Sequence, residues 1–346
     1  MVAPHFILSK SKLLEQVKLL EDLGLKVSYS YKTNHEVGDL LQKISTSTDF
    51  SIHAKDEIEK IKDKSKISFF TQAESAEELK EILGTGIRTF VIDNETDLER
   101  ILQSSKELNL KINLSLRMKF REHRIGTGKY FVYGMPAKRI NELISELKDN
   151  PLIDKLGIHI HRKSQNTSEW EIKEELEDSL TEESLKRIDM INLGGGLPAK
   201  YRSYTIEVSS YIFQKLTNVK NFLDKYNIQT IIEPGRFLAA PCIKLQTEII
   251  QIQDNNLIIN TTIYNCALDN ILTGTKMLVE TEKKEDDEGQ HYLIKGNSPT
   301  RDDIFRYKVK LDYPKVGDTI TFLNAGAYNY TTDFFGYKKL ETKIVD

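Results

Sequence analysis

The sequence predicts an α/β protein in which a (β/α)8 TIM barrel is followed by an antiparallel β domain. Short apolar runs, rich in β-branched and aromatic residues, alternate with amphipathic stretches up to residue 240. This alternation is typical of βαβ units and a parallel sheet. The later residues alternate apolar and polar side chains with a period of two, which is typical of an antiparallel sheet. We therefore expect a barrel at residues 8–240 and a β domain at 241–346 that also takes in residues 1–7.

Eight strands are expected in the first part of the chain, and a closed barrel is built from eight βα units. An open, doubly wound sheet is the alternative that this pattern leaves. Segments such as SAEELKEILGTG and ETDLERILQSSKELN, with apolar residues at helical spacing and a capping residue in front, predict helices between the strands. The expected strands are 26–31, 48–52, 67–71, 88–92, 111–116, 155–161, 189–193 and 229–233.

The second part is expected to be a β domain because four of its segments alternate with turn residues between them. These segments are CIKLQTEIIQIQDNNLIINTTIYN, HYLIKG, YKVKLDYP and DTITFLNAGAYNY. The segment HFILS near the start of the chain is also strand-like, so it is expected to join this domain.

Composition and charge exclude several classes of function. The net charge is −3 and the basic residues are dispersed, which argues against nucleic acid and anionic membranes as partners. No apolar run approaches the roughly 18 residues of a membrane-spanning helix. The first residues lack the apolar core of a signal peptide, and the two cysteines are too few and too far apart for a zinc site or a disulfide framework. We expect a soluble, cytoplasmic protein without a metal that acts on a small molecule.

Chemically distinctive residues follow four of the predicted strands. Lys32 follows the first, His161 ends the sixth, Gly194, Gly195 and Gly196 follow the seventh, and the segment Glu233–Arg236 follows the eighth. In a barrel the carboxyl ends of the strands share one face, and that face carries the active site. Each signal is weak alone, since three glycines can form a tight turn and a single histidine is often structural. Their convergence on one face predicts a site.

The residue types at this face suggest one kind of chemistry. Glycines ahead of a helix let backbone N–H groups approach an anion, and Arg236 offers a bidentate partner for phosphate. A lysine close to a phosphate site and a carboxylate suits a Schiff base with an aldehyde cofactor. Glu233 is then placed to keep a ring nitrogen protonated, which creates an electron sink.

The same segments resemble the motifs of the alanine-racemase-like, fold-type III pyridoxal-phosphate (PLP) enzymes. The resemblance lies in YSYKTN, HIHRKSQN, INLGGGLP, IIEPGRFL and NAGAYNYTTDFFGY, which occur in the family's order and span nearly the whole chain. It implies a PLP-binding barrel, a following β domain, and a homodimer with active sites at the subunit interface.

Carried over position by position, the resemblance makes Lys32 the Schiff-base lysine, places His161 against the pyridine ring and pairs Glu233 with the ring nitrogen. The glutamate favours decarboxylases, because alanine racemases have an arginine there. The implied reaction removes the α-carboxylate of an amino acid through a quinonoid state. The residues implied to hold the cofactor's phosphate are Ser164, Gly194, Gly195, Gly196, Gly235, Arg236 and Tyr328.

Two segments depart from the family pattern. Family decarboxylases carry G-x-x-C-(D/E)-x-x-D in the β domain, and the cysteine helps to return a proton to the substrate. Aligned on Gly296 and Asp303, the segment GNSPTRDDIF has Pro299 at the cysteine position, so the proton donor is not identified. The H-x-G-S element is also altered. The candidate substrate-binding residues on these segments are Arg162, Lys163, Thr300, Arg301, Asp302 and Asp303, with Asp269 as a further acid.

The resemblance leaves the substrate open. Ornithine, lysine, arginine, diaminopimelate and carboxynorspermidine decarboxylases share these elements. The missing cysteine and the added basic residues favour a specialised member, such as the decarboxylase associated with microcin C-type peptide-nucleotides, and a substrate with a distal anionic group. An amino-acid racemase of the same fold and a catalytically silent PLP-fold binding protein are the alternatives.

Overall fold

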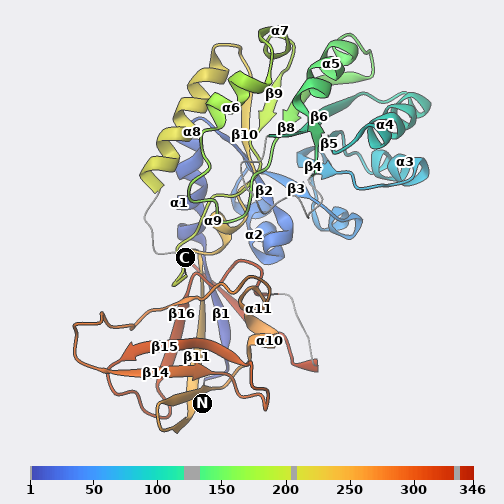
Figure 1. Cartoon of the computed structure of the whole chain (residues 1–346). Helices are drawn as coiled ribbons and strands as arrows, with labels where there is room; N and C mark the ends of the chain where they lie inside the picture. Colours follow the sequence, from blue (N-terminus) through green and yellow to red (C-terminus); the bar gives the residue numbers. More distant parts are fainter. Residues whose placement is uncertain (1, 121–132, 204–208, 331–335) are drawn as a thin grey trace.

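The computed structural model describes residues 2–120, 133–203, 209–330 and 336–346, and its strands form two separate sheets. Figure 1 shows them as two parts, a barrel surrounded by helices and a β domain beside it. The segment 331–335, which belongs to the last of the motifs above, lies outside the described residues.

The first sheet is a closed barrel of parallel strands. β2 pairs with β3 on one side and with β10 on the other, and β5 pairs with β6, so the sheet has no open edge between them. The barrel prediction is confirmed, and the open-sheet alternative is wrong. The strands are β2 (Lys26–Ser30), β3 (Asp49–Ile52), β4 (Ile67–Phe70), β5 (Thr89–Ile92), β6 (Ile112–Lys119), β8 (Ile153–His159), β9 (Met190–Asn192) and β10 (Gln229–Ile232), with the short β7 (Met135–Pro136) paired to the end of β6.

Helices cover the outside of the barrel (Figure 1). The two quoted helical segments are α3 (Ala76–Gly84), which begins with a capping box between Ser75 and Glu78, and α4 (Glu95–Leu108), capped by Asn94. The others are α1 (Lys10–Glu21), α2 (His35–Ile44), α5 (Ala137–Leu147), α6 (Ile172–Ser179), α7 (Glu182–Leu185), α8 (Ser209–Asp224) and α9 (Arg236–Ala239), with 3-10 turns at Tyr31–Thr33, Lys55–Lys60 and Lys64–Lys66.

The second sheet combines both ends of the chain. β1 (His5–Ser9) pairs antiparallel with β11 (Ile243–Gln253) and parallel with β17 (Glu341–Val345). Leu8 and Ser9 therefore pair within this sheet, although the predicted division assigns residues from 8 onwards to the barrel. The remaining elements are β12 (Asn256–Ile259), α10 (Ile263–Cys266), α11 (Leu268–Thr273), β13 (Leu278–Val279), β14 (Gln290–Lys295), β15 (Ile304–Leu311) and β16 (Thr319–Leu323).

Asn34 joins the two sheets at the turn after β2. Its side-chain oxygen accepts a hydrogen bond from the Val37 amide at 3.2 Å and so caps α2. Its side-chain nitrogen donates to the Gly326 carbonyl, which follows β16, at 2.8 Å. The Tyr29 hydroxyl donates to the Asn34 carbonyl at 3.0 Å, and Asn34 is fully buried. This one amide therefore fixes the turn that carries Lys32 against the second sheet.

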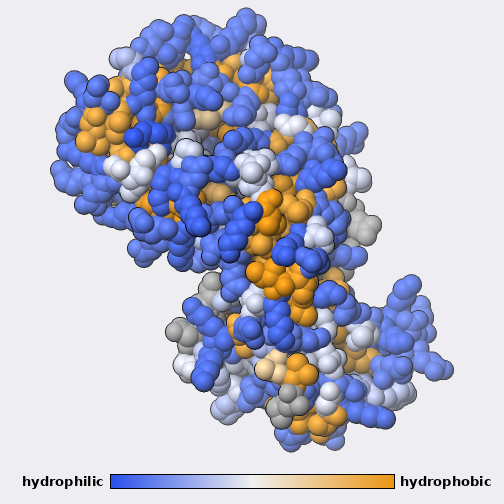
Figure 2. Space-filling model, turned by 180° about the vertical axis from the view of Figure 1, so that it is seen from behind, coloured by the Kyte–Doolittle hydropathy of each residue, from blue (hydrophilic) through white to orange (hydrophobic). Residues whose placement is uncertain are grey.

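The surface seen in Figure 2 is mainly hydrophilic over both parts, and an apolar patch gathers where the barrel meets the β domain. Among the described residues, the helices are all too short or too polar to cross a membrane.

We expect Asn34→Ala to lower the free energy of unfolding by about 2 to 4 kcal/mol. The lost helix cap accounts for about 1 kcal/mol, and the unpaired Gly326 carbonyl adds roughly 1 to 3 kcal/mol. Asn94→Ala is the matched control, because Asn94 caps α4 through the Asp97 amide at 3.0 Å and its side-chain nitrogen bonds within the same turn. It should cost about 1 kcal/mol. Equal losses in denaturant titrations would show that the Gly326 contact contributes nothing.

Candidate active site

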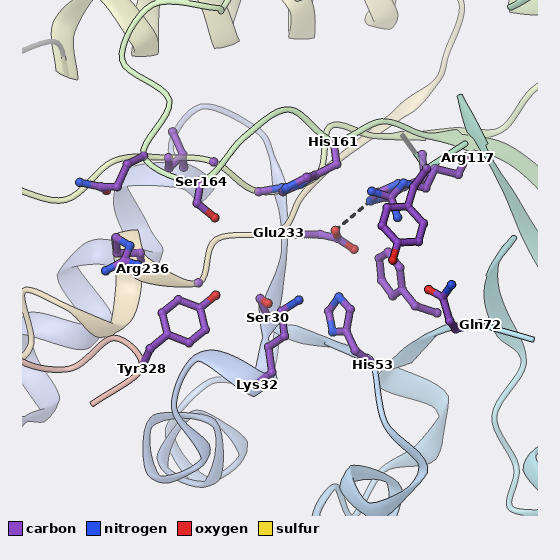
Figure 3. Close-up of a pocket in the computed structure, with 18 residues that line it drawn as sticks. Ser30, Lys32, His53, Gln72, Arg117, His161, Ser164, Glu233, Arg236 and Tyr328 are labelled. Carbon is purple, nitrogen blue, oxygen red and sulfur yellow. Dashed lines mark hydrogen bonds and ion pairs between the residues drawn. The ribbon is translucent and has the colours of Figure 1, made fainter. Parts of the chain in front are cut away.

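A cavity of about 450 Å³ lies at the carboxyl ends of the barrel strands. Figure 3 shows the side chains that line it. Most come from residues at or just after the strand ends, and Tyr328 comes from the second sheet, after β16. The volume is in the range of small-molecule and cofactor sites. The predicted residues that line it are Lys32, His161, Ser164, Gly195, Gly196, Glu233, Gly235, Arg236 and Tyr328.

Lys32 points into this cavity from the 3-10 turn at Tyr31–Thr33 (Figure 3). Its neighbours Tyr31 and Thr33 are buried, so Lys32 is the exposed residue of this turn, and it lines the cavity. Enclosure lowers the pKa of the Lys32 amine, an effect that the nearby Glu233 partly opposes. A lowered pKa makes the amine a better nucleophile near neutral pH. The surroundings of Lys32 therefore favour its uncharged amine more than bulk water does.

Glu233 is a buried carboxylate held by three donors. The Ser51 hydroxyl donates to Oε1 at 2.6 Å, the Asn192 side-chain nitrogen donates to the same oxygen at 2.8 Å, and His159 Nε2 lies 3.0 Å from Oε2. Burial alone would raise the pKa of Glu233, but His159 and the Ser51 bond outweigh it and bring the pKa to about 2. The carboxylate therefore stays charged inside the barrel.

His161 presents its ring to the cavity beside Glu233 (Figure 3). The Gly195 amide donates to its Nδ1 at 3.2 Å, so this nitrogen is an acceptor. The surrounding protein lowers the pKa of His161 to about 3, with further lowering from His159 and Arg117. The ring is thus uncharged at neutral pH, and its planar face suits stacking on an aromatic group.

Ser164, Arg236 and Tyr328 lie together at one end of the cavity (Figure 3). Gly195 and Gly196 also line the cavity. At Gly196, which has a φ of 107°, a Cβ would meet the Lys163 carbonyl at 2.7 Å, so only glycine fits. This end is rich in donors and suits an anion.

Gly194 does not line the cavity. Its amide donates to the Asn192 side chain at 2.9 Å, and its carbonyl accepts from the Glu233 amide at 2.9 Å. It therefore fixes the strand end on which Glu233 depends. Residues 197–203 after the glycines form no helix, and α8 begins only at Ser209, so the expected helix does not start at the glycines.

Arg236 is engaged differently from the prediction. Its two terminal nitrogens donate to Asp269 at 2.5 and 2.9 Å, and one also donates to the Tyr201 hydroxyl at 3.1 Å. A bidentate phosphate contact would have to replace the Asp269 pair. Its Nε is buried and has no partner among the described residues, so one donor is available to a bound anion. Asp269 is a partner of this arginine and does not line the cavity.

The two basic candidates of the altered H-x-G-S element lie outside the cavity lining. Arg162 pairs with Glu175 and stacks over the Phe120 ring at 4.8 Å. Lys163 pairs with Glu169 at 2.7 Å. Both positive charges therefore have negative partners away from Lys32 and Glu233.

The candidates of the β domain also lie outside this chain's cavity. Asp303 is fully buried and accepts from the Ile263 amide at 2.9 Å and from Ser298, so it organises the loop. The Thr300 hydroxyl donates to Tyr264 at 2.9 Å. Arg301 and Asp302 are exposed at the tip of the loop.

Several residues of the site were not predicted. His159, which lines the cavity, and Ser51 and Asn192, which do not, together hold Glu233. A second group of unpredicted residues also lines the cavity. That second group is His53, Phe70, Gln72, Arg117 and Tyr133. All of these except Tyr133 stand at or close to the carboxyl end of a predicted strand, which is the signal that would have found them. His159 is two residues before His161, so the period of a strand places both on one face.

The described residues suit pyridoxal phosphate. The cavity holds an amine with a lowered pKa, an unprotonated carboxylate that faces a neutral ring, and an anion-binding end with an unpartnered arginine donor. The two cysteines take no part in it. Both are buried outside the cavity lining, and burial raises the pKa of Cys266 to about 12.

Comparisons with known proteins agree with this site. Residues 10–240 match the family described as pyridoxal-dependent decarboxylase, pyridoxal binding domain. Antizyme inhibitor 2 of Xenopus laevis is 22% identical over 91% of this chain and 74% of its own length. Diaminopimelate decarboxylase of Haemophilus influenzae is 26% identical over 87% of this chain and 77% of its own length.

The fold also has solved counterparts. A diaminopimelate decarboxylase from M. jannaschii, solved in complex with L-lysine, superimposes with a TM-score of 0.83 and 20% identity, over 99% of this chain and 87% of that one. Because the family match extends over the whole barrel, from α1 to the segment after Glu233 and Arg236, this chain belongs to the pyridoxal-dependent decarboxylases and is a PLP-dependent amino-acid decarboxylase of fold type III.

Proposed function

We propose that Lys32, His161 and Glu233 carry the reaction of this decarboxylase. The observation that supports the proposal most is the charged carboxylate of Glu233, which is buried without a lysine or arginine bonded to it among the described residues. An unbalanced buried charge is costly, so the site is complete only with a positive group beside it. The protonated ring nitrogen of PLP is such a group.

Each residue has a distinct task in this proposal. Bound PLP supplies the electron sink for the pair left on Cα when the carboxylate departs. Lys32 holds the cofactor covalently between turnovers, and its amine can afterwards return a proton to Cα. His161 keeps the ring in place from one face, and Glu233 keeps the ring nitrogen protonated.

The phosphate is proposed to lie at the end of the cavity formed by Ser164, Gly195, Gly196 and Tyr328, with Gly194 and Gly235 shaping the backbone. Arg236 lines the cavity, and its buried Nε has no hydrogen-bond partner among the described residues. This free donor supports the assignment. Its pair with Asp269 fixes the guanidinium, so less freedom is lost when the anion binds.

We propose a cytoplasmic homodimer in which the barrel and the β domain, divided near residue 240, both contribute to each active site. Three features support the dimer: the exposed loop with Arg301 and Asp302, the exposed Leu272 and Tyr307, and the apolar patch of Figure 2. In this arrangement the loop reaches the partner's cavity. A monomer in sedimentation equilibrium would contradict the dimer, and cell fractionation tests the location.

The cavity also supports a preference about the substrate. Among the described residues that line it, Glu233 is the sole carboxylate, and it is committed to the ring nitrogen. A distal ammonium group would therefore find no free acid in this chain's own cavity. We propose that the substrate's far end is neutral or anionic.

Borohydride reduction in the presence of PLP should attach the cofactor to wild-type protein at Lys32. Lys32→Ala should abolish the attachment, because no other described lysine lines the cavity. Lys55→Ala is the control, since Lys55 is exposed and paired with Glu78. Peptide mass spectrometry reads the result, and a cofactor-modified peptide from Lys32→Ala protein would remove Lys32 from this role.

Glu233→Gln should bind PLP and lose turnover, with kcat falling by about a hundredfold or more. The amide keeps the shape and can still accept a hydrogen bond from His159, but it carries no charge to hold the ring proton. Ser164→Ala is the comparison, because it should weaken cofactor binding more than kcat at saturating PLP. A kcat within a few-fold of wild type for Glu233→Gln would show that the ring proton does not depend on this carboxylate.

Substrate competition tests the charge preference. An amino acid with a distal carboxylate or phosphate should have a higher kcat/KM than lysine or ornithine, and the difference should shrink as salt is added. Arg301→Glu should weaken the preference if the loop reaches the partner's cavity. Lys308→Glu makes the same charge change at another exposed position of the β domain and should not. A clear preference of wild type for diamino acids would contradict the proposal.

A further inference from the structure

His159 holds a position that the proposed reaction does not yet explain. It is the last residue of β8 and is 1% exposed. In the register of the barrel it lies between Arg117 of β6 and Asn192 of β9. Its Nε2 lies 3.0 Å from Glu233 Oε2, the oxygen that neither Ser51 nor Asn192 contacts. One carboxylate oxygen thus has two donors and the other has His159.

The ring orientation of His159 is fixed by packing. The Phe70 ring meets it edge-on, with centroids 5.0 Å apart and an interplanar angle of 88°. Phe70 is itself stacked on His53 at 4.4 Å. A ring held this way cannot turn its Nε2 away from Glu233 without displacing Phe70, so the contact with Oε2 is built into the packing of the barrel.

The two ring nitrogens of His159 have different surroundings. Nδ1 is buried and has no partner among the described residues. Nε2 lies against Glu233 Oε2, and because a carboxylate oxygen can only accept, Nε2 carries a proton and donates it to Glu233.

The hydrogen bond from His159 fixes the direction of the Glu233 carboxylate, together with the bonds from Ser51 and Asn192. Of the roughly four lone-pair positions of a carboxylate, three are filled by protein donors, and one is left.

We propose that His159 is a positioning residue, which orients the last free lone pair of Glu233 toward the cofactor's ring nitrogen and thereby makes the site selective for a ring that bears a proton there. The inference rests on the proposed function, because it assumes that Glu233 meets the ring nitrogen of PLP. It adds a residue that acts through Glu233.

Cofactor binding, without turnover, tests this inference. The two probes are PLP and its 1-deaza analogue, which has a carbon in place of the ring nitrogen, and each is titrated into cofactor-free protein by absorbance. Wild-type protein should bind PLP about tenfold or more tightly than the analogue, as expected for a hydrogen bond to a charged group. His159→Phe should bring the two dissociation constants within about threefold of each other, and His159→Gln, which keeps a donor, should restore part of the preference.

His53→Phe is the matched control. His53 is a second histidine of the same cavity, stacks on the same phenylalanine and makes no hydrogen bond to Glu233 in the described structure, so the wild-type preference should remain. A merely structural role for His159 would weaken both probes equally and leave their ratio unchanged. A folded His159→Phe protein with the wild-type ratio overturns the inference. Wild-type protein that binds PLP and the analogue equally well overturns it together with the role of Glu233, whereas failure to bind either probe overturns the proposed function itself.

Discussion

The negative charge of Glu233 is the constraint around which the barrel is arranged. A buried carboxylate is tolerated only if its oxygens are hydrogen-bonded, and here the donors come from three different strands. Ser51 belongs to β3, His159 to β8 and Asn192 to β9, and Ser51 is itself within 2.8 Å of Ser28 on β2. These residues are distant in sequence and meet only when the barrel closes. The oxygens of this buried carboxylate are thus hydrogen-bonded only once the barrel has closed.

The cavity separates two electrostatic regions. Lys32 and Glu233 lie in its centre (Figure 3), close to His53 and His161, whose lowered pKa keeps both rings neutral. Arg236 lies at the end proposed for the phosphate, and its charge is balanced by Asp269. Because Asp269 neutralises Arg236 locally, the arginine does little to stabilise the charge of Glu233. Each charged group is therefore balanced by its own partners. This is how one small cavity can hold the Lys32 amine, with its lowered pKa, near the charges of Glu233 and Arg236.

Much of this architecture followed from local pattern. All eight barrel strands, the change to a β domain and the strand-end positions of Lys32, His161 and Glu233 could be predicted, since hydrophobic period and turn residues act over short distances. The partners of charged groups could not. The sequence suggested that Arg162 and Lys163 could bind the substrate, but they form ion pairs with Glu175 and Glu169. His159 and Asp269 reach Glu233 and Arg236 across 74 and 33 residues, and no local pattern reports such pairs. Arg301 and Asp302 lie on an exposed loop outside this chain's own cavity.

The pairing of β1 with β17 has a consequence for how the protein is made. The first strand leaves the ribosome before any of its partners exist, because β11 begins at Ile243 and β17 at Glu341. The barrel can close once Ile232 is synthesised, but Gly326 and Tyr328, which complete the turn of Lys32 and the anion-binding end, arrive almost a hundred residues later. During translation β1 has an unpaired edge that invites contact with other nascent chains. The cofactor can therefore bind only near the end of synthesis. A chain truncated before Gly326 would form a barrel with an incomplete site.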